Sequence, residues 1–137
     1  MKKSLVLLLW VALAANVFAQ ETKAPAAKVN GPVLAFEKNT HDFGDIYQGD
    51  NVEHVFKFTN TGNEPLIISN IQVTCGCTAP SWPKNPIPPG GKGEIKIGFN
   101  SAGKMGRQNK TVTVVSNAVN EDNLISFVTN ILAKNPQ

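Results

Sequence analysis

Two cysteines, Cys75 and Cys77, are the residues of this chain whose types and spacing could support chemistry. They are the only cysteines in 137 residues, and a single glycine separates them. In an extended strand they would share a face, with Cα atoms about 6.6 Å apart after two rises of about 3.3 Å, which is the long end of disulfide geometry. Gly76 allows the backbone to contract, so the sequence permits a disulfide that closes a very small ring.

The cysteine pair is compatible with a structural role and with a redox role. Closing so short a loop contributes only about 1.6 kcal/mol of loop-closure entropy, so stability alone is a weak reason for the bond. Strained, exposed disulfides are easily reduced, which suits thiol–disulfide exchange. The chain has no thioredoxin-like βαβ context or helix N-terminus to lower a thiol pKa. In the structural alternatives, the sulfurs pack on the core face beside Val73, or the bond shapes the turn that follows.

Metal binding is a further alternative for the same pair. Two thiolates fall short of the four ligands of a structural zinc site, whereas Cu(I) prefers soft sulfur ligands and needs few of them. Met105 offers a thioether, and His41 and His54 offer imidazoles, as weak additional ligands. None of them stands at a spacing that requires a metal. We therefore expect no bound cofactor and keep Cu(I) as the alternative.

The chain lacks the common sequence motifs of hydrolases and nucleotide-binding enzymes. It contains no Gly-x-Ser-x-Gly, no His-Glu-x-x-His and no glycine-rich phosphate loop. His41 and Asp42 are adjacent, so in a strand they point to opposite faces and form no acid–base dyad. His54 is in phase with apolar neighbours, which is typical of a hydrogen-bonded histidine at the edge of a core. We predict that the protein is not an enzyme.

A proline-rich stretch with a tryptophan is the second candidate for binding. An aromatic side chain in a rigid loop loses little entropy when it binds, so such residues serve as interface anchors. The alternative is that the ring folds back and covers an end of the domain, as large apolar rings usually do. The recognition loop that we predict comprises Trp82, Pro83, Pro86, Pro88 and Pro89.

The elements that must position these residues are expected to be strands. Apolar and polar residues alternate with period two, and turn residues recur at short intervals. Strands are expected at 33–37, 41–46, 52–58, 66–73, 95–99, 111–115 and 124–132. A bulge is expected near Ser69 and Asn70, where the phase of the apolar residues slips, and Gly44 indicates another bulge or a bend. The stretch 79–91, with five prolines, is expected to be a loop. About seven strands and no helix predict an all-β, antiparallel sandwich, with a closed barrel as the alternative.

The first residues resemble a secretory signal rather than part of a domain. Met1–Lys3 is basic, residues 5–15 are apolar, and Val17–Ala19 has small residues where a signal peptidase cleaves. The apolar run is shorter than the roughly 20 residues that span a bilayer. We therefore expect residues 1–19 to be a cleaved signal peptide, with no stable membrane insertion afterwards. The mature protein would then be secreted, in the periplasm or outside the cell, where cysteine pairs are usually oxidised.

The mature chain is predicted to hold one domain. Residues 20–32 are small and polar and are expected to form a flexible tether, followed by the domain at 33–133 and a tail at 134–137. The formal charge of +3 falls to +1 once Lys2 and Lys3 are removed. The other basic residues are scattered and form no stripe, so we expect a protein partner and no nucleic acid.

Four short motifs carry a resemblance to a known family: HDFG at 41–44, FTNTG at 58–62, CGCT at 75–78 and PPG at 88–90. In this order and spacing the chain resembles a bacterial secreted family that is catalogued as a domain of unknown function. That family is itself similar to the immunoglobulin-like domains of Hydin and the major sperm protein. The resemblance covers about residues 33–133.

The resemblance implies an immunoglobulin-like β-sandwich with a non-enzymatic role, and it supplies no catalytic residues. We therefore expect a secreted, non-catalytic protein-binding or scaffolding module. Its contact surfaces would be the turn at Cys75 and Cys77, the proline loop, and sheet edges that accept a partner strand. Thiol–disulfide exchange or Cu(I) binding through the two cysteines is the alternative.

Overall fold

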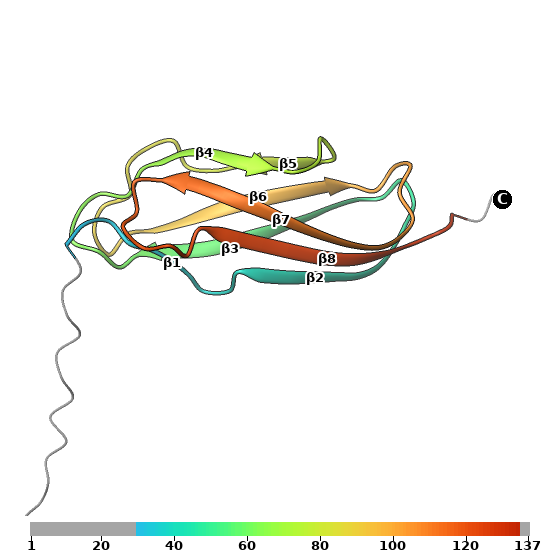
Figure 1. Cartoon of the computed structure of the whole chain (residues 1–137), viewed down its shortest axis with the longest axis horizontal. Coiled ribbons are helices and arrows are strands. Elements are labelled where there is room, and N and C mark those ends of the chain that lie inside the picture. Colours follow the sequence, from blue (N-terminus) through green and yellow to red (C-terminus); the bar gives the residue numbers. More distant parts are fainter. Residues whose placement is uncertain (1–29, 135–137) are drawn as a thin grey trace, which may run out of the picture.

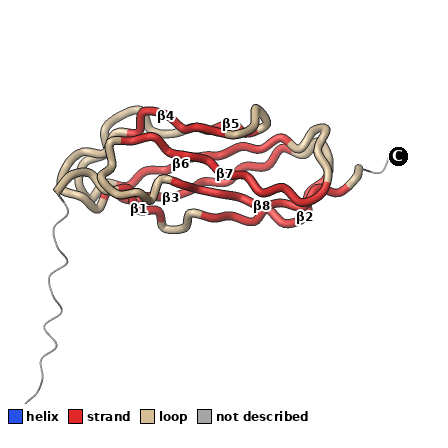
Figure 2. Tube along the Cα trace, viewed as in Figure 1, coloured by secondary structure: helices blue, strands red, loops and turns tan. Residues whose placement is uncertain are grey.

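The computed structural model describes residues 30–134, which form two stacked β-sheets (Figure 1; Figure 2). The strands are β1 (Leu34–Phe36), β2 (Thr40–Tyr47), β3 (Asn51–Asn60), β4 (Ile68–Val73), β5 (Thr78–Ser81), β6 (Lys92–Asn100), β7 (Gly106–Ser116) and β8 (Leu124–Leu132). No helix in this part of the chain is long and apolar enough to cross a membrane. The predicted signal peptide, most of the predicted tether and the last three residues lie outside the described range.

The two sheets have four strands each. Sheet A has the order β1-β3-β6-β5, and sheet B has the order β2-β8-β7-β4. Because each sheet keeps two free edges, the sandwich prediction is confirmed and the closed barrel is not. About seven strands were expected, and residues 30–134 contain eight. All pairs are antiparallel except β2 and β8, which run parallel. Consecutive strands β1 and β2 belong to different sheets, so the chain changes layer between them.

The core lies between the sheets and explains the period-two pattern. On β6, Ile95, Ile97 and Phe99 are buried, while Glu94 and Lys96 between them are exposed. Each apolar side chain of this kind contributes about 1.5–3 kcal/mol when it is fully removed from water. The largest fully buried side chains are Phe56, Phe58, Phe99, Phe127, Leu34, Leu66, Ile95, Ile97, Ile125, Ile131, Val112 and Val114.

A bulge in β2 keeps its apolar side chains on the inner face. Gly44 has a φ of 69°, and its N–H donates to Oδ1 of Asp42 at 2.8 Å. The register with β8 shifts between Asp42 and Asp45. Because of this extra residue, Phe43 and Ile46 both face the core although they are three positions apart. The bulge predicted at Gly44 is confirmed.

The bulge predicted in β4 is confirmed as well, but the limits of the strand are not. The register between β4 and β7 shifts between Ile68 and Asn70, which lets Ile68 and Ile71 both be buried. Leu66 precedes the strand and forms an isolated bridge with Ile87 instead. The N–H of each residue donates to the carbonyl of the other at 2.8 Å.

The prediction that 79–91 is entirely a loop is wrong, because β5 (Thr78–Ser81) includes Pro80. β5 is the edge strand of sheet A and bonds only to β6. The N–H of Asn100 donates to the carbonyl of Cys77 at 2.9 Å. Bonding positions alternate along an antiparallel pair, so the nitrogen of Pro80 faces the open edge, where no donor is needed.

A buried asparagine at the end of β3 organises one end of the sandwich. Asn60 is fully buried. Its Oδ1 accepts hydrogen bonds from the N–H groups of Val33 at 3.1 Å and Gly62 at 3.0 Å. Its Nδ2 donates to the carbonyls of Glu64 at 2.7 Å and Ile87 at 3.0 Å. One side chain therefore joins the approach to β1, the turn after β3 and the proline-rich segment.

The domain begins slightly before the predicted boundary at residue 33. Gly31 and Pro32, which were assigned to the tether, are buried. The N–H of Gly31 donates to Oδ1 of Asn63 at 2.7 Å, and the carbonyl of Pro32 accepts from the N–H of Val119 at 2.9 Å. These contacts make both residues part of the packed end of the sandwich.

Candidate functional site

The two cysteines form a disulfide in the turn that carries the chain from β4 in sheet B to β5 in sheet A. Their Cα atoms are 5.2 Å apart, shorter than the spacing of an extended strand. The N–H of Cys77 lies 3.2 Å from Sγ of Cys75, and the N–H of Thr78 donates to the carbonyl of Cys75 at 3.1 Å. The sequence suggested that both cysteines continue the face of β4, whereas the backbone has already turned.

The disulfide is partly accessible from solvent. Both cysteines are half-buried, and Cys77 packs against the core. Gly76 is exposed, and a Cβ placed there would meet no atom within 4 Å. The turn is thus anchored on the Cys77 side and open at Gly76. Such a bond can clip the turn, and a thiolate can approach it from outside.

The structure does not bring the predicted additional ligands to the cysteines. His41 on β2 and His54 on β3 lie at the opposite lateral edge of the sandwich from β4 and β5. Met105 is exposed in the turn before β7. Within residues 30–134 no group of three or more His, Cys, Asp or Glu side chains is placed to hold a metal ion. The two histidines contact each other, but they do not form a common site with the cysteines.

Trp82 packs against the core instead of standing free in its loop. The ring is partly buried, and its Nε1 is buried without a hydrogen-bond partner in the described residues. The Nζ of Lys84 lies 3.1 Å from the ring centroid, which is a cation–π contact. This arrangement matches the alternative in which the ring covers the domain. Among the prolines of the predicted recognition loop, Pro83 is half-buried, whereas Pro86, Pro88 and Pro89 are exposed.

The outer face of sheet A has two shallow hollows. One, of about 430 Å³, lies beside Trp82 and is lined also by Val55, Ser81, Pro83, Glu94 and Lys96. The other, of about 360 Å³, is lined by Glu37, Lys57, Phe58, Lys92, Gly93 and Glu94.

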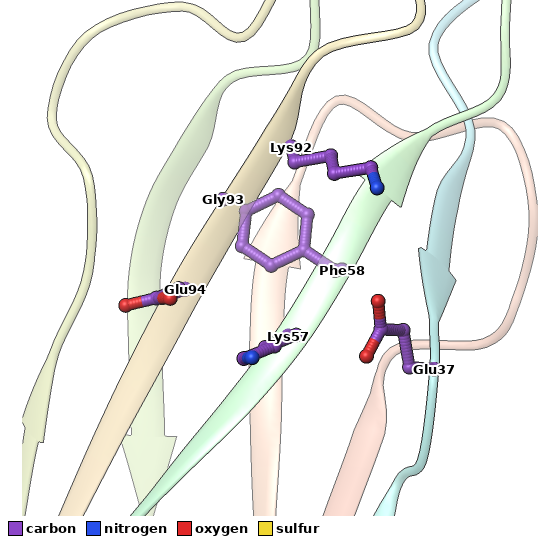
Figure 3. A pocket seen from close by; sticks show the side chains of 6 residues that line it. All are labelled: Glu37, Lys57, Phe58, Lys92, Gly93 and Glu94. Atoms are coloured by element: carbon purple, nitrogen blue, oxygen red, sulfur yellow. The ribbon is translucent and has the colours of Figure 1, made fainter.

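Figure 3 shows lysine and glutamate side chains surrounding the ring of Phe58 in the second hollow. Beside the first hollow, Nζ of Lys96 lies 3.7 Å from Oε2 of Glu53, and both side chains are largely exposed. Charges of both signs alternate over this face. They favour a solvated surface over a site for one kind of ion.

Three of the four edge strands are protected against pairing with another chain. β1 has only three residues. β2 carries Asp42 and Asp45 beside its bulge, and β5 contains Pro80. Short length, charge, bulges and proline are the means by which natural sheets block their edges.

The edge of β4 is different, because no charged residue or proline occurs between Leu66 and Thr78. The bulge affects only its beginning, and the strand pairs regularly with β7 from Asn70 to Val73. Its free edge is therefore uncharged, regular and adjacent to the disulfide turn. The sequence contained this signal, but the position of the strand at an edge depends on strand order.

The hydrogen-bonding pattern shows which groups β4 offers. The N–H of Val114 on β7 donates to the carbonyl of Asn123, on the β8 side, at 2.8 Å. Because the bonding direction alternates along a strand, the residues on either side of Val114 bond to β4. Thr113 pairs there with Gln72, and Val115 pairs with Asn70. The N–H and C=O groups of Ile71 and Val73 therefore point to the open edge.

A family model described as "Protein of unknown function (DUF1573)" matches residues 34–131. No protein among the curated ones matches the chain. The resemblance to a family of unknown function is thereby confirmed. That the four short motifs are characteristic of this family, and that the chain is similar to Hydin, stay predictions.

Several solved structures share the fold at low identity. A protein of unknown function from Porphyromonas gingivalis W83 has a TM-score of 0.64 and 16% identity, over 80% of this chain and 51% of that chain. The ASH/PapD-like domain 7 of human CEP192 has a TM-score of 0.57 and 13% identity, over 98% and 100%. The VesB protease of Vibrio cholerae has a TM-score of 0.53 and 12% identity, over 74% and 32%. The chain thus spans about half the length of the Porphyromonas protein, and these similarities show the fold alone.

Proposed function

We propose that this chain, which belongs to the family described as Protein of unknown function (DUF1573), is a secreted, non-catalytic module that binds another protein. The observation that carries the proposal is the unprotected edge of β4. An edge with free backbone donors and acceptors accepts an extended segment of a partner as an additional strand. Main-chain hydrogen bonds then supply affinity, and alternate side chains supply specificity.

The chemistry of the partner segment follows from the edge. An extended strand beside β4 bonds to the N–H and C=O groups of Ile71 and Val73, and its alternate side chains continue the inner face of sheet B. Since no charge lies on this edge, a charged partner residue would lose hydration without gaining an ion pair. The partner segment is therefore uncharged and rich in β-branched or aromatic residues.

The non-catalytic part of the proposal has its own support. Neither hollow on sheet A has a histidine or a cysteine in its lining, and Ser81, Glu94 and Lys96 in the first hollow are exposed. The VesB protease shares the fold over only 32% of its length. The similarity thus concerns a part of that protein, and the scaffold alone does not imply proteolysis.

A charge placed on the β4 edge tests the binding mode. Gln72→Lys adds an exposed lysine to the edge, whereas Thr111→Lys adds one to the same outer face on the interior strand β7. We expect the capture of partner proteins from extracts of the producing cells to fall at least tenfold for Gln72→Lys and to stay within twofold for Thr111→Lys. Quantitative mass spectrometry of proteins retained by each immobilised variant measures the ratio. Equal capture by both variants would contradict the proposed edge.

A second candidate is thiol chemistry at Cys75 and Cys77, which is supported by the partly accessible position of their disulfide. In exchange, a partner dithiol would reduce the disulfide to two thiols and leave as a disulfide itself, so that electrons balance. Cu(I) binding would require the reduced pair, since thiolates are the ligands.

Thiol titration in glutathione buffers separates this candidate from the first. Under thiol exchange, we expect the wild-type chain to expose two thiols within the ordinary range of glutathione buffers, and a Cys75→Ser/Cys77→Ser variant to expose none. Loss of the bond should lower the free energy of unfolding by no more than about 1.6 kcal/mol. A disulfide that survives excess reduced glutathione, no Cu(I) uptake after forced reduction, and undiminished partner capture by the double variant would together reject thiol chemistry.

A further inference from the structure

The two histidines of the chain stack on each other across the sandwich. The ring centroids of His41 and His54 are 3.5 Å apart, and the ring planes differ by 8°. His41 belongs to β2 in sheet B, and His54 belongs to β3 in sheet A. The stack therefore joins the two layers at the lateral edge opposite the disulfide turn.

Aromatic side chains enclose the stack. Phe43 meets His41 edge-on at 4.6 Å between centroids, and Phe56 meets His54 in the same way at 4.7 Å. Phe43 in turn contacts Phe127 at 5.4 Å. Each histidine shares the inner face of its strand with the phenylalanine two residues later, as period two requires. The pair is half-buried, so it is only partly hydrated.

The electrostatic surroundings favour neutral imidazoles. Burial lowers the pKa of His41, Lys38 lowers it further, and Asp42 opposes them. For His54, burial lowers the pKa first, followed by His41 and then Lys38. The residues paired with the two histidines in the neighbouring strands are apolar: Phe127 on β8 and Ile97 on β6.

Strand β2 depends on this contact more than an interior strand would. Its only partner in sheet B is β8, and its bulge interrupts that pairing. In sheet A, β1 pairs only with residues 58–60 of β3. The N–H of Glu37 donates to the carbonyl of Lys57 at 3.0 Å, and from residue 51 to 56 the strand partner of β3 is β6. The ring stack bridges the gap between these two incompletely paired strands.

We propose that the stack of His41 and His54 is an acid-sensitive latch between the two sheets. While both rings are neutral, or only one of them is protonated, they hold β2 against β3. When both are protonated, two positive charges face each other at the stacking distance in a half-buried position beside Phe43 and Phe56. Repulsion then separates β2 from β3, while the rest of the sandwich stays folded. The proposal is independent of the protein-binding function.

The direction of the pH effect follows from linkage. A histidine in an unfolded chain titrates near pH 6.5, and both histidines here have a lower pKa in the folded state. Between these values the unfolded or opened chain binds more protons, so stability rises with pH. The contribution is fully present above about pH 6.5 and is lost as the pH falls through the interval below it.

Hydrogen exchange and urea unfolding between pH 8 and pH 5 test the latch. After correction for intrinsic exchange rates, we expect amides of residues 40–47 to lose protection at low pH, while those of β6 keep it. The urea midpoint should fall over the same interval. A His41→Phe/His54→Phe variant keeps two aromatic rings but cannot be protonated there, so its β2 protection should not respond to pH. His54→Lys places a fixed charge in the stack and should release β2 already at pH 7.5.

Two results would overturn the latch. One is an unchanged pH response of residues 40–47 in the double phenylalanine variant. The other comes from NMR titration of the two imidazole rings in the wild-type chain, where we expect pKa values below 6.5 for both. Ordinary values for both histidines would mean that the second proton meets no resistance in the folded protein.

Discussion

Replacing Asn60 with alanine is expected to lower the free energy of unfolding by about 3–5 kcal/mol. The substitution removes four side-chain hydrogen bonds at once. It removes the partner of the N–H groups of Val33 and Gly62 and of the carbonyl of Glu64, whereas the carbonyl of Ile87 still accepts from the N–H of Leu66 at 2.8 Å. Asn60 itself is fully buried, and each buried polar group left unpaired costs about 1–3 kcal/mol before relaxation or water entry. Urea denaturation at pH 7.5 measures the change.

An exposed asparagine provides a matched control for this prediction. Asn117 also bonds to the backbone through both side-chain atoms, with the N–H of Ile67 at 2.7 Å and the carbonyl of Pro65 at 3.2 Å. Because Asn117 is exposed, water can replace its bonds, and Asn117→Ala should cost about 1 kcal/mol or less. Asn60→Asp conserves shape but loses both donors, so it should also be strongly destabilising. Similar losses for Asn60→Ala and Asn117→Ala would show that burial does not set the cost.

Replacing Gly62 with alanine is expected to destabilise the domain by about 2–4 kcal/mol. A Cβ at this position would overlap the carbonyl oxygen of Gly31, and it would lie 2.7 Å from the nitrogen of Val33 and 2.9 Å from Cα of Pro32. These are backbone atoms, so no side-chain rotation relieves the overlap. The segment cannot simply move away either, because Asn60 holds the nitrogen of Val33.

The glycine between the cysteines is the control for this second substitution. Nothing lies within 4 Å of a Cβ built on Gly76, and its φ is not in the positive range. Gly76→Ala should therefore change the free energy of unfolding by less than about 0.5 kcal/mol. Thermal melts of both variants at equal concentration compare them directly. A Gly62→Ala melt that coincides with the wild-type curve would mean that residues 31–33 move freely.

The sandwich could be predicted from the sequence because its signal is local. The alternation of Ile95, Ile97 and Phe99 with charged residues identifies a strand with one buried face, whatever the rest of the chain does. The two bulges were also predictable, since a glycine and a slip in the apolar phase mark them within a few residues. Strand order is not local, and here the sequence alone was insufficient. Pro80 argued against a strand, but an edge position tolerates it.

The candidate sites were predictable only in part for the same reason. The composition of Cys75-Gly76-Cys77 permitted the disulfide, and the apolar phase placed His54 toward the core. The stacking of His54 on His41 depends on β2 and β3 meeting across two sheets, which no spacing along the chain reveals. The partners of Asn60 are likewise up to 27 residues away, so its motif resembled an ordinary turn.

The parallel pairing of β2 and β8 has a mechanical consequence. The described chain starts at one end of the sandwich and finishes at the other (Figure 1). β8 is its last strand, and only the three-residue strand β1 precedes β2. A tension applied through the termini pulls β2 and β8 in opposite directions along their length. The hydrogen bonds between them are then loaded together in shear instead of opening one after another like a zipper. A pair of strands loaded in this way resists extension until several bonds fail at once.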